Sequence, residues 1–284
     1  MKISTQTAGL ARVFGDTGAV RMLCEAGYDC LDYSMFYKQN DRLPVEGEGF
    51  MEHCRLLREL ADSYGVTFNQ THAPFASYIE GDDAYNEWVK PLIIRSIEAS
   101  GILGAGNIII HPFSVSKNQK KANIDFFNSL LPHAQKANVR IALENMFCWS
   151  EKNRRLEKNV CSDGPEFCDY IDSLDREYFT ACLDVGHCGL VGEDASEMIR
   201  QLGGERLKCL HVHDNDMIED RHTLPYMGKL DFDKITKALK DIGYDGEMTL
   251  EADNFLVGFP DELMKGAAVL MQWTARHLAS LCEK

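Results

Sequence analysis

Hydrophobic and polar positions along the chain form two kinds of segment that alternate from end to end. Short apolar runs are followed by longer stretches in which apolar side chains recur at helical spacing. The short runs predict strands at 2–5, 30–33, 66–71, 107–110, 140–143, 179–183, 207–212 and 248–250. The longer stretches predict helices at 17–26, 49–64, 84–103, 120–137, 165–173, 195–202, 232–242 and 261–281.

Strands that alternate with helices favour βα units and a parallel sheet. Eight such units in a row close most naturally into a (β/α)8 TIM barrel, and a doubly wound open sheet is the alternative. The length of 284 residues is near the ~250 typical of one barrel. Because no linker, repeat or low-complexity tract marks a second domain, we expect an α/β protein with a single TIM-barrel domain over residues 1–284.

Charge and cysteine content narrow the classes of function. The 30 Lys and Arg against 44 Asp and Glu give a net charge of −14, which makes binding to nucleic acid or to an anionic membrane unfavourable. The ten cysteines form no CxxC pair, and Cys30, Cys182 and Cys209 lie in apolar runs, as buried thiols do in a reducing compartment. With no signal-like start and no long apolar segment, we expect a soluble cytoplasmic protein.

Side chains with metal-binding chemistry follow most of the predicted strands. They are His72, His111, Glu144, Asp184, His211 and Glu251, with His187 three residues after Asp184. In a TIM barrel the carboxyl ends of the strands form one rim, which carries the active site. Polar groups at buried strand ends are costly unless they are paired or bound to metal. The pattern predicts a divalent cation at this rim, and a hydrogen-bonded polar core residue is the alternative for each residue taken singly.

The densest concentration of such side chains is the stretch 207–222, LKCLHVHDNDMIEDRH. His211 and His213 alternate at period two, so on a strand both would face the same way and either is a candidate ligand. Asp220 and His222 repeat that spacing in the loop beyond the strand. Imidazole nitrogens together with carboxylate oxygens are suitable ligands for a divalent ion.

Several of these motifs resemble a known family. ALEN at 142–145, LDVGH at 183–187, HVHD at 211–214, DRH at 220–222 and TLEAD at 249–253 are similar to motifs of the xylose isomerase-like TIM-barrel superfamily. That superfamily includes sugar phosphate isomerase/epimerase proteins, ketose 3-epimerases, inosose dehydratases and hydroxypyruvate isomerases, and endonuclease IV is a relative. The resemblance covers nearly the whole chain and is specific for the superfamily, but it does not specify a substrate.

The resemblance implies a set of metal ligands. The single ion of ketose epimerases is held at positions matching Glu144, Asp184, His211 and Glu251. The three zinc ions of endonuclease IV-like members also use positions matching His72, His111, His187, Asp220 and His222. Those five side chains, and His213, are therefore either additional ligands or contacts to substrate. His211 is assigned because the family's histidine lies three residues before an aspartate, here Asp214. The expected cofactor is one to three divalent ions, Mn2+, Zn2+ or Co2+.

The resemblance also implies a reaction. Glu144 and Glu251 would be both ligands and proton shuttles, and His187 would hold a substrate oxygen or a second ion. We expect a metal-dependent isomerase or epimerase that acts on a sugar, sugar phosphate or keto-polyol by proton transfer through an enediolate. A lyase of the inosose dehydratase type, an endonuclease IV-like metallo-phosphoesterase and a binding protein without turnover are the alternatives.

Two departures disfavour a DNA repair nuclease. The opening residues 1–18 resemble the isomerases, and the loop at 73–75 lacks the residues that such nucleases insert into DNA. The net charge of −14 points the same way, so we expect a small carbohydrate as the binding partner and leave a homo-oligomer open.

The pocket walls are predicted less directly. Phe36, Phe113 and Trp149 follow predicted strands and are expected either to line the substrate pocket or to pack at the top of the barrel. The polar insertion 148–164 carries a basic cluster, Lys152, Arg154, Arg155 and Lys158, and is expected to be a lid over an anionic substrate or a solvated loop. Gly228 and Lys229 form a phosphate-binding turn or a plain turn.

Overall fold

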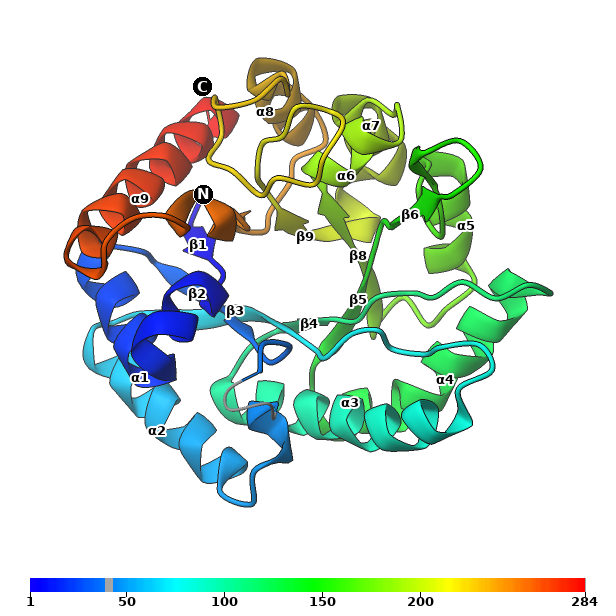
Figure 1. Ribbon diagram of the computed structural model, residues 1–284, viewed down its shortest axis with the longest axis horizontal. Helices are drawn as coiled ribbons and strands as arrows, with labels where there is room; N and C mark the ends of the chain where they lie inside the picture. The colour runs from blue at the N-terminus through cyan, green and yellow to red at the C-terminus, as the bar shows by residue number, and fades with distance from the viewer. Residues whose placement is uncertain (39–42, 284) are drawn as a thin grey trace.

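In the described part of the chain, eight parallel strands form the centre of the molecule. The computed structural model describes residues 1–38 and 43–283. Its central strands are β1 (Ile3–Thr5), β2 (Cys30–Ser34), β3 (Thr67–His72), β4 (Asn107–Ile109), β5 (Arg140–Glu144), β8 (Phe179–Asp184), β9 (Leu207–His211) and β10 (Met248–Leu250). Figure 1 shows these strands surrounded by a ring of helices.

The ring of strands is closed. Six strands pair in the order β2-β3-β4-β5-β8-β9, and β1 pairs with β10. Parallel bridges join the two groups, between Gln6 and Asp32 on one side and between Val212 and Leu250 on the other. Backbone hydrogen bonds continue across both junctions, such as that from the Val212 N–H to the Thr249 carbonyl at 2.9 Å. The prediction of a TIM barrel is therefore confirmed, and the open doubly wound sheet is excluded.

Over residues 1–38 and 43–283, eight long or medium helices cover the outside of the barrel. They are α1 (Ala8–Ala26), α2 (Phe50–Ser63), α3 (Asp83–Leu103), α4 (Gln119–Ala137), α5 (Gly164–Asp172), α7 (Ala195–Arg206), α8 (Phe232–Asp241) and α9 (Asp261–Glu283). Helix α8 illustrates the pattern, because Phe232, Ile235 and Leu239 recur at helical spacing and are all buried. Among the described residues, no helix is both long enough and apolar enough to cross a membrane.

Two helices extend beyond their predicted bounds through a glycine. Helix α1 begins at Ala8, and its backbone turns at Gly15, where φ is 68° and ψ is 169°. Helix α7 continues to Arg206 past Gly203, where φ is 66° and ψ is 165°. Since a glycine adopts such positive φ values at little cost, each allows a helical stretch outside the predicted bounds to join the predicted helix.

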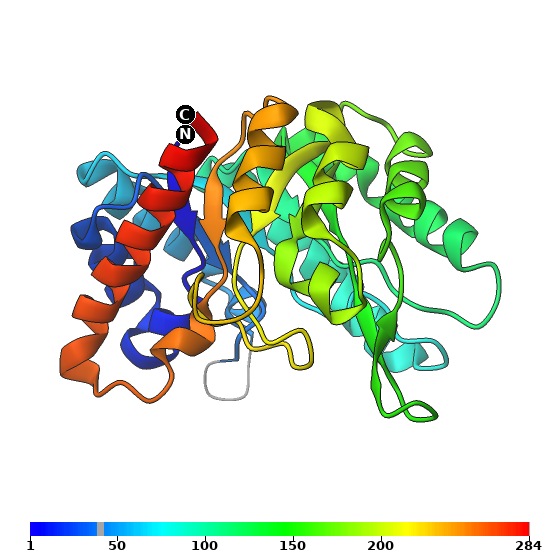
Figure 2. The ribbon, with the colours of Figure 1, turned by 90° about the horizontal axis from the view of Figure 1, so that it is seen from above.

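Several short elements differ from the predicted pattern. The insertion 148–164, expected to be a loop, contains most of an antiparallel hairpin of β6 (Phe147–Ser150) and β7 (Arg155–Lys158), in which Trp149 pairs with Leu156. A short helix, α6 (Val185–Leu190), directly follows β8. Two 3-10 turns, η1 (Pro44–Glu46) and η2 (Asp253–Leu256), complete the described elements. Figure 2 shows the hairpin and the loop after β9 projecting from the same end of the barrel.

The interior of the barrel contains both a small apolar cluster and a polar one. Ile109, Ala142, Cys182 and Cys209 form the apolar cluster, and all ten cysteines of the chain are free thiols. In the polar cluster, Gln70 donates a hydrogen bond from Nε2 to Asp32 Oδ2 at 2.9 Å, and both side chains are buried. A buried carboxylate inside a barrel needs partners, and those of Asp32 connect it to the rim above.

Candidate metal centre

The structure brings the predicted ligands together at the carboxyl ends of the strands. Five of them end or closely follow a strand: His72 on β3, Glu144 on β5, Asp184 on β8, His211 on β9 and Glu251 after β10. His111 follows β4, and His187 lies in α6. All of these side chains are buried except that of His111, which is 13% exposed.

Glu144, Asp184, His211 and Glu251 form the first cluster, in which one ligand atom from each residue lies within 4.8 Å of the others. His211 Nδ1 is 3.3 Å from Glu144 Oε1 and 2.9 Å from Glu251 Oε2. Nevertheless His211 Nδ1, Glu251 Oε2 and Glu144 Oε2 are buried without a hydrogen bond. Buried polar atoms are rarely left unpaired. His211 Nδ1 and Glu251 Oε2 face each other and fit a cation bound in this cluster, and Glu144 Oε2 points to the neighbouring histidines.

A second cluster shares one residue with the first. His111 Nε2 lies 3.0 Å from Glu144 Oε2 and 3.0 Å from His72 Nε2, and His72 Nε2 is 3.8 Å from the same carboxylate oxygen. The three residues satisfy the spacing of a metal site. Glu144 therefore offers one oxygen to each cluster.

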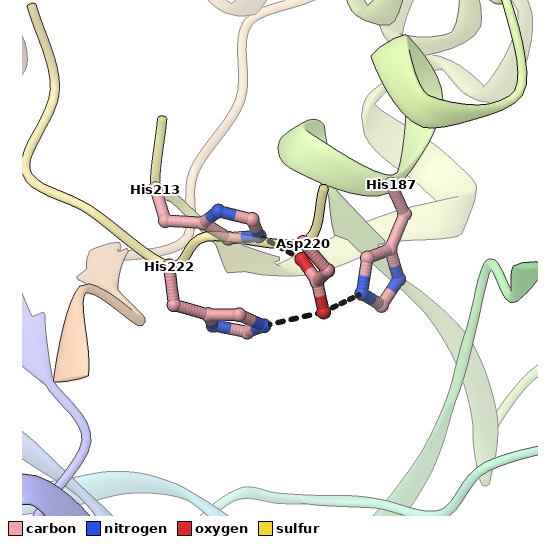
Figure 3. Close-up of side chains that lie close together, drawn as sticks. All are labelled: His187, His213, Asp220 and His222. Carbon is pink, nitrogen blue, oxygen red and sulfur yellow. Dashed lines mark hydrogen bonds and ion pairs between the residues drawn. The ribbon is translucent and has the colours of Figure 1, made fainter. Parts of the chain in front are cut away.

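The third cluster contains His187, His213, Asp220 and His222 (Figure 3). Asp220 is central: its carboxylate oxygens lie 2.9 Å from His222 Nε2, 3.7 Å from His213 Nε2 and 3.8 Å from His187 Nε2. The rings of His213 and His222 are stacked with centroids 4.0 Å apart. His211 and His213 thus serve different clusters, because β9 ends at His211 and the strand periodicity does not extend to the next histidine.

Four of the histidines are held by a hydrogen bond from the ring nitrogen that faces away from the clusters. The acceptors are the carbonyl oxygens of Ala73 for His72 (2.9 Å), Asn145 for His187 (2.8 Å) and Glu251 for His222 (2.9 Å), and Asp32 Oδ2 for His211 (3.3 Å). Metal-binding histidines almost always carry such a second bond, which fixes the ring and leaves the other nitrogen for the ion. The arrangement therefore suits metal binding at all three clusters.

Sequence reasoning missed the residues that orient the ligands. Gln6 donates from Nε2 to Glu251 Oε1 at 2.6 Å. Asn145 accepts a hydrogen bond from the Asp184 N–H at 2.8 Å and donates one to the Asp184 carbonyl at 3.0 Å. Asp32, fully buried, accepts from His211. A signal existed for Asp32, since a charged residue within the apolar run 30–33 must have a buried partner.

Replacing Asp32 with Asn is expected to weaken metal binding about ten- to hundredfold, as loss of a carboxylate partner of a metal-binding histidine usually does. The ring of His211 donates a hydrogen bond of 3.3 Å to the Asp32 carboxylate. An uncharged amide at position 32 would no longer polarise that ring. Competition with a chromophoric chelator measures the affinity. Asp62→Asn on α2, where the carboxylate pairs with Arg58 at the surface, is the control. Equal affinities for the two variants would contradict the role of Asp32.

The clusters hold opposite charges close together. Burial alone would raise the pKa of Glu144, but His211 and His111 hold that pKa well below its usual range. Burial would likewise lower the pKa of His187, but Asp184, Asp220 and Glu144 raise it to about 10. The pKa of His222 is raised in the same way, against burial, by Asp220 and Glu251. Without metal, therefore, Glu144 is ionised and the imidazoles of His187 and His222 are protonated at neutral pH.

A cavity of about 400 Å³ opens over the clusters. Phe36 lines it, as expected, and its ring centroid lies 4.8 Å from that of His72. Phe75 and Phe147 line it as well. Phe113 lies outside this cavity and packs in the barrel wall against Tyr78 and Phe126. Trp149 also lies outside it, in a neighbouring groove.

The two candidate anion sites are occupied by the protein's own groups. The Gly228 N–H donates to Asp214 Oδ2 at 2.7 Å, so this turn holds an aspartate in place. In the basic cluster, Lys158 pairs with Asp163 and Glu193, and Arg155 pairs with Glu157 at 3.1 Å. These contacts agree with a plain turn at Gly228 and compensate Arg155 and Lys158, whereas Lys152 and Arg154 form no ion pair with the described residues.

Comparison with known proteins identifies the family. The family model described as "Xylose isomerase-like TIM barrel" matches residues 20–276. The chain belongs to this family. The resemblance seen in the motifs is therefore confirmed, although membership alone does not specify a reaction.

The individual relatives include both uncharacterised proteins and sugar epimerases. The uncharacterised protein Rv0498 of Mycobacterium tuberculosis is 25% identical over 248 residues, covering 83% of this chain and 87% of that protein. The ketose 3-epimerase of Arthrobacter globiformis is 31% identical over 107 residues, 38% of this chain and 35% of that enzyme. The crystal structure of a D-tagatose 3-epimerase-like protein superposes with a TM-score of 0.76 at 19% identity, covering 100% of this chain and 98% of that one.

Proposed function

We propose that the protein is a metal-dependent sugar isomerase or epimerase that transfers a proton through an enediolate. The observation that carries the proposal is the placement of Glu144 and Glu251, two buried carboxylates of one four-residue cluster. They come from β5 and β10, which β8 and β9 separate around the ring. Two bases on different sides of one small pocket are what inversion at a carbon requires.

Glu144, Asp184, His211 and Glu251 would hold the catalytic ion. One imidazole nitrogen with three carboxylates suits Mn2+, Co2+ or Zn2+. A bound divalent ion would supply Lewis-acid polarisation of a substrate carbonyl, which acidifies the neighbouring C–H. Up to two further ions fit the clusters around His111 and Asp220, giving one to three in all.

The chain's own residues would move the proton. Glu144 takes it from the carbon next to the carbonyl, and Glu251 returns one on the opposite face, oriented by the hydrogen bond from Gln6 (2.6 Å). His187, whose Nδ1 is tied to the Asn145 carbonyl, offers its Nε2 to a substrate oxygen or to a second ion. Phe36, Phe75 and Phe147 in the cavity wall exclude water from the intermediate.

The size of the cavity and the relatives support a carbohydrate substrate. A volume of about 400 Å³ is at the lower end of the ~300–1,000 Å³ usual for small-molecule sites. The relatives include a ketose 3-epimerase and a D-psicose 3-epimerase. A ketose with a free carbonyl and a neighbouring hydroxyl is the substrate class that uses both glutamates.

Exchange with solvent tests this proposal. Incubation of the Mn2+-loaded protein with D-fructose, D-tagatose or D-psicose in D2O is expected to place deuterium on the carbon that is epimerised or isomerised, since the base exchanges with water. Protein stripped with a chelator is the control and should show neither turnover nor exchange until metal is restored. Conversion of a ketose that is insensitive to chelation would contradict the proposal.

The second and third clusters favour one further candidate, a metallo-phosphoesterase, because clustered metal ions are typical of phosphoryl transfer. Such an enzyme would release phosphate that contains 18O from labelled water and would show no exchange at carbon. A lyase of the inosose dehydratase type would share the deuterium exchange but give a product lighter by one water. Mass spectrometry of the products separates the three reactions.

A further inference from the structure

A groove of about 840 Å³ lies next to the candidate active-site cavity, and the proposed function leaves it unused. Its lining comes from three places: the hairpin of β6 and β7, the end of α6, and the loop after β9. The last two of these segments also carry His187, His213, Asp220 and His222. We infer that this groove binds a second, neutral sugar ring joined to the ketose in the cavity, so that the substrate is a ketose-containing disaccharide or glycoside. The inference rests on the proposed function.

Residues that are neighbours along the chain line the cavity and the groove. On one wall, Phe147 lines the cavity and Trp149 lines the groove. The two residues are two apart on β6, so their side chains project from the same face of the strand. On the other wall, Asp220 lines the cavity and its neighbour Glu219 lines the groove. The groove therefore begins next to the cavity along both the hairpin and the loop after β9, which is where a ligand seated at the metal cluster would have to extend.

The groove is held open by contacts within the protein. The Asn215 side chain donates to the Gly186 carbonyl at 3.0 Å and fixes the loop after β9 to α6. On the other side, Lys158 of the hairpin pairs with Glu193, which follows α6. Since both walls are tied to the same helix, ligand binding needs little ordering of the protein.

The exposed side chains suit the face of a sugar ring. Trp149 is 53% exposed, and on the opposite wall Met217 and Ile218 are 43% and 67% exposed. An indole face packs against the C–H face of a pyranose, and the amphipathic character of tryptophan suits a ligand that is partly apolar and partly wet. Such exposure of large apolar groups in a fixed groove marks a binding surface.

The charges of the groove favour a neutral ligand. Arg154, Arg155 and Lys158 line it together with Glu157 and Glu219. Arg155 pairs with Glu157 at 3.1 Å, Glu219 pairs with Arg221 at 3.3 Å, and Lys158 has its own acidic partners. Within the described part of the chain, two of the three lining cations, Arg155 and Lys158, are compensated by acidic partners. A phosphate would therefore gain little from them, whereas hydroxyl groups can bond to both signs of charge.

A substrate panel tests the inference. The probes are isomaltulose, leucrose and lactulose, disaccharides that end in a fructose residue, with D-fructose for comparison. At least one disaccharide is expected to show a kcat/KM about tenfold higher than D-fructose. The ratio of kcat/KM for that disaccharide to kcat/KM for D-fructose should fall about fivefold to tenfold in Trp149→Ala, the scale of a lost aromatic contact. Trp149→Phe, which keeps an aromatic face, should keep most of the ratio.

Trp273→Ala is the matched control, because Trp273 is 65% exposed on α9, away from the groove, and should leave the ratio unchanged. If Trp149→Ala lowers kcat/KM for D-fructose and the disaccharides by the same factor, or if no disaccharide exceeds D-fructose, the inference is wrong.

If no ketose is turned over, the proposed function fails separately, and a binding measurement then tests whether the groove holds a sugar. Isomaltulose should change the tryptophan fluorescence of the wild type and not that of Trp149→Phe. If the two proteins respond alike, the inference is wrong.

Discussion

Replacing either Glu144 or Glu251 with Gln is expected to lower kcat at least ~10²-fold at saturating metal and substrate, the usual loss when a general acid or base is removed. Glutamine keeps a carbonyl oxygen near the cluster, where His211 Nδ1 lies 3.3 Å from one glutamate and 2.9 Å from the other, but it cannot accept the proton. KM should change less than kcat, because the lost interaction belongs mainly to the transition state.

Isotope exchange makes the two variants distinguishable. If each glutamate serves one face of the substrate, each variant should still exchange deuterium into one epimer and not into the other. Glu247→Gln is the matched control, since this half-buried carboxylate lies just before β10 at the opposite end of the strand from Glu251. Full activity in both Glu144→Gln and Glu251→Gln would remove these residues from the mechanism.

Metal affinity is expected to rise steeply with pH from neutrality up to about pH 10. Without metal, the pKa of His187 is raised to about 10, and those of His211 and His222 lie well above the usual value. These imidazoles are therefore protonated at pH 7 and must lose a proton before they bind an ion. The pKa of Glu144 is lowered, so this carboxylate releases no proton in that range. Affinity should thus gain about one power of ten per pH unit for each proton released, or about 10³-fold per pH unit if His187, His211 and His222 each release one.

Calorimetry in buffers of different ionisation enthalpy counts the released protons directly. His187→Gln should release one proton fewer than the wild type, because it removes the imidazole whose pKa is raised to about 10. His133→Gln is the control, since this residue lies on α4, outside the clusters. Binding that releases no protons and does not depend on pH would show that the imidazoles are not ligands.

The barrel and its candidate ligands were predictable because both follow from regular spacing. Strands of three to six residues between helices define the barrel, and a polar side chain at the end of a buried strand stands out against its apolar neighbours. For this reason His72, Glu144, Asp184, His211 and Glu251 were found one strand at a time. Their convergence then follows from the closure of the ring.

What the sequence left undetermined depends on local backbone geometry. The stretch VGHCGL, with two glycines, has the composition of a loop but forms α6, whose first turn is capped by Asp184 through a 2.8 Å bond to the His187 N–H. The charged hairpin of β6 and β7 lacks the apolar alternation of a typical strand. Trp149 consequently lies in the groove and not in the cavity, a difference that no residue spacing reveals.

Asn145 and Asp32 show a further limit of predicting a site from sequence patterns. Neither faces the cavity, and their importance comes from hydrogen bonds to Asp184 and His211 across strands that are distant in sequence. A pattern along one strand cannot identify its partner on another strand. Only the folded ring brings residue 32 next to residue 211, which makes the orienting residues visible as a group.

The sharing of Glu144 between two clusters has a consequence for the order in which ions are loaded. One of its oxygens faces His211 at 3.3 Å and the other faces His111 at 3.0 Å, so a single carboxylate would compensate two cations. The first ion should therefore enter the cluster that adds Asp184 and Glu251, because that cluster carries more negative charge. The second ion then meets a carboxylate that is already partly neutralised, together with a neighbouring cation. Loading should proceed in successive steps of falling affinity. In a cell with scarce metal, the cluster of Glu144, Asp184, His211 and Glu251 would be filled before the others.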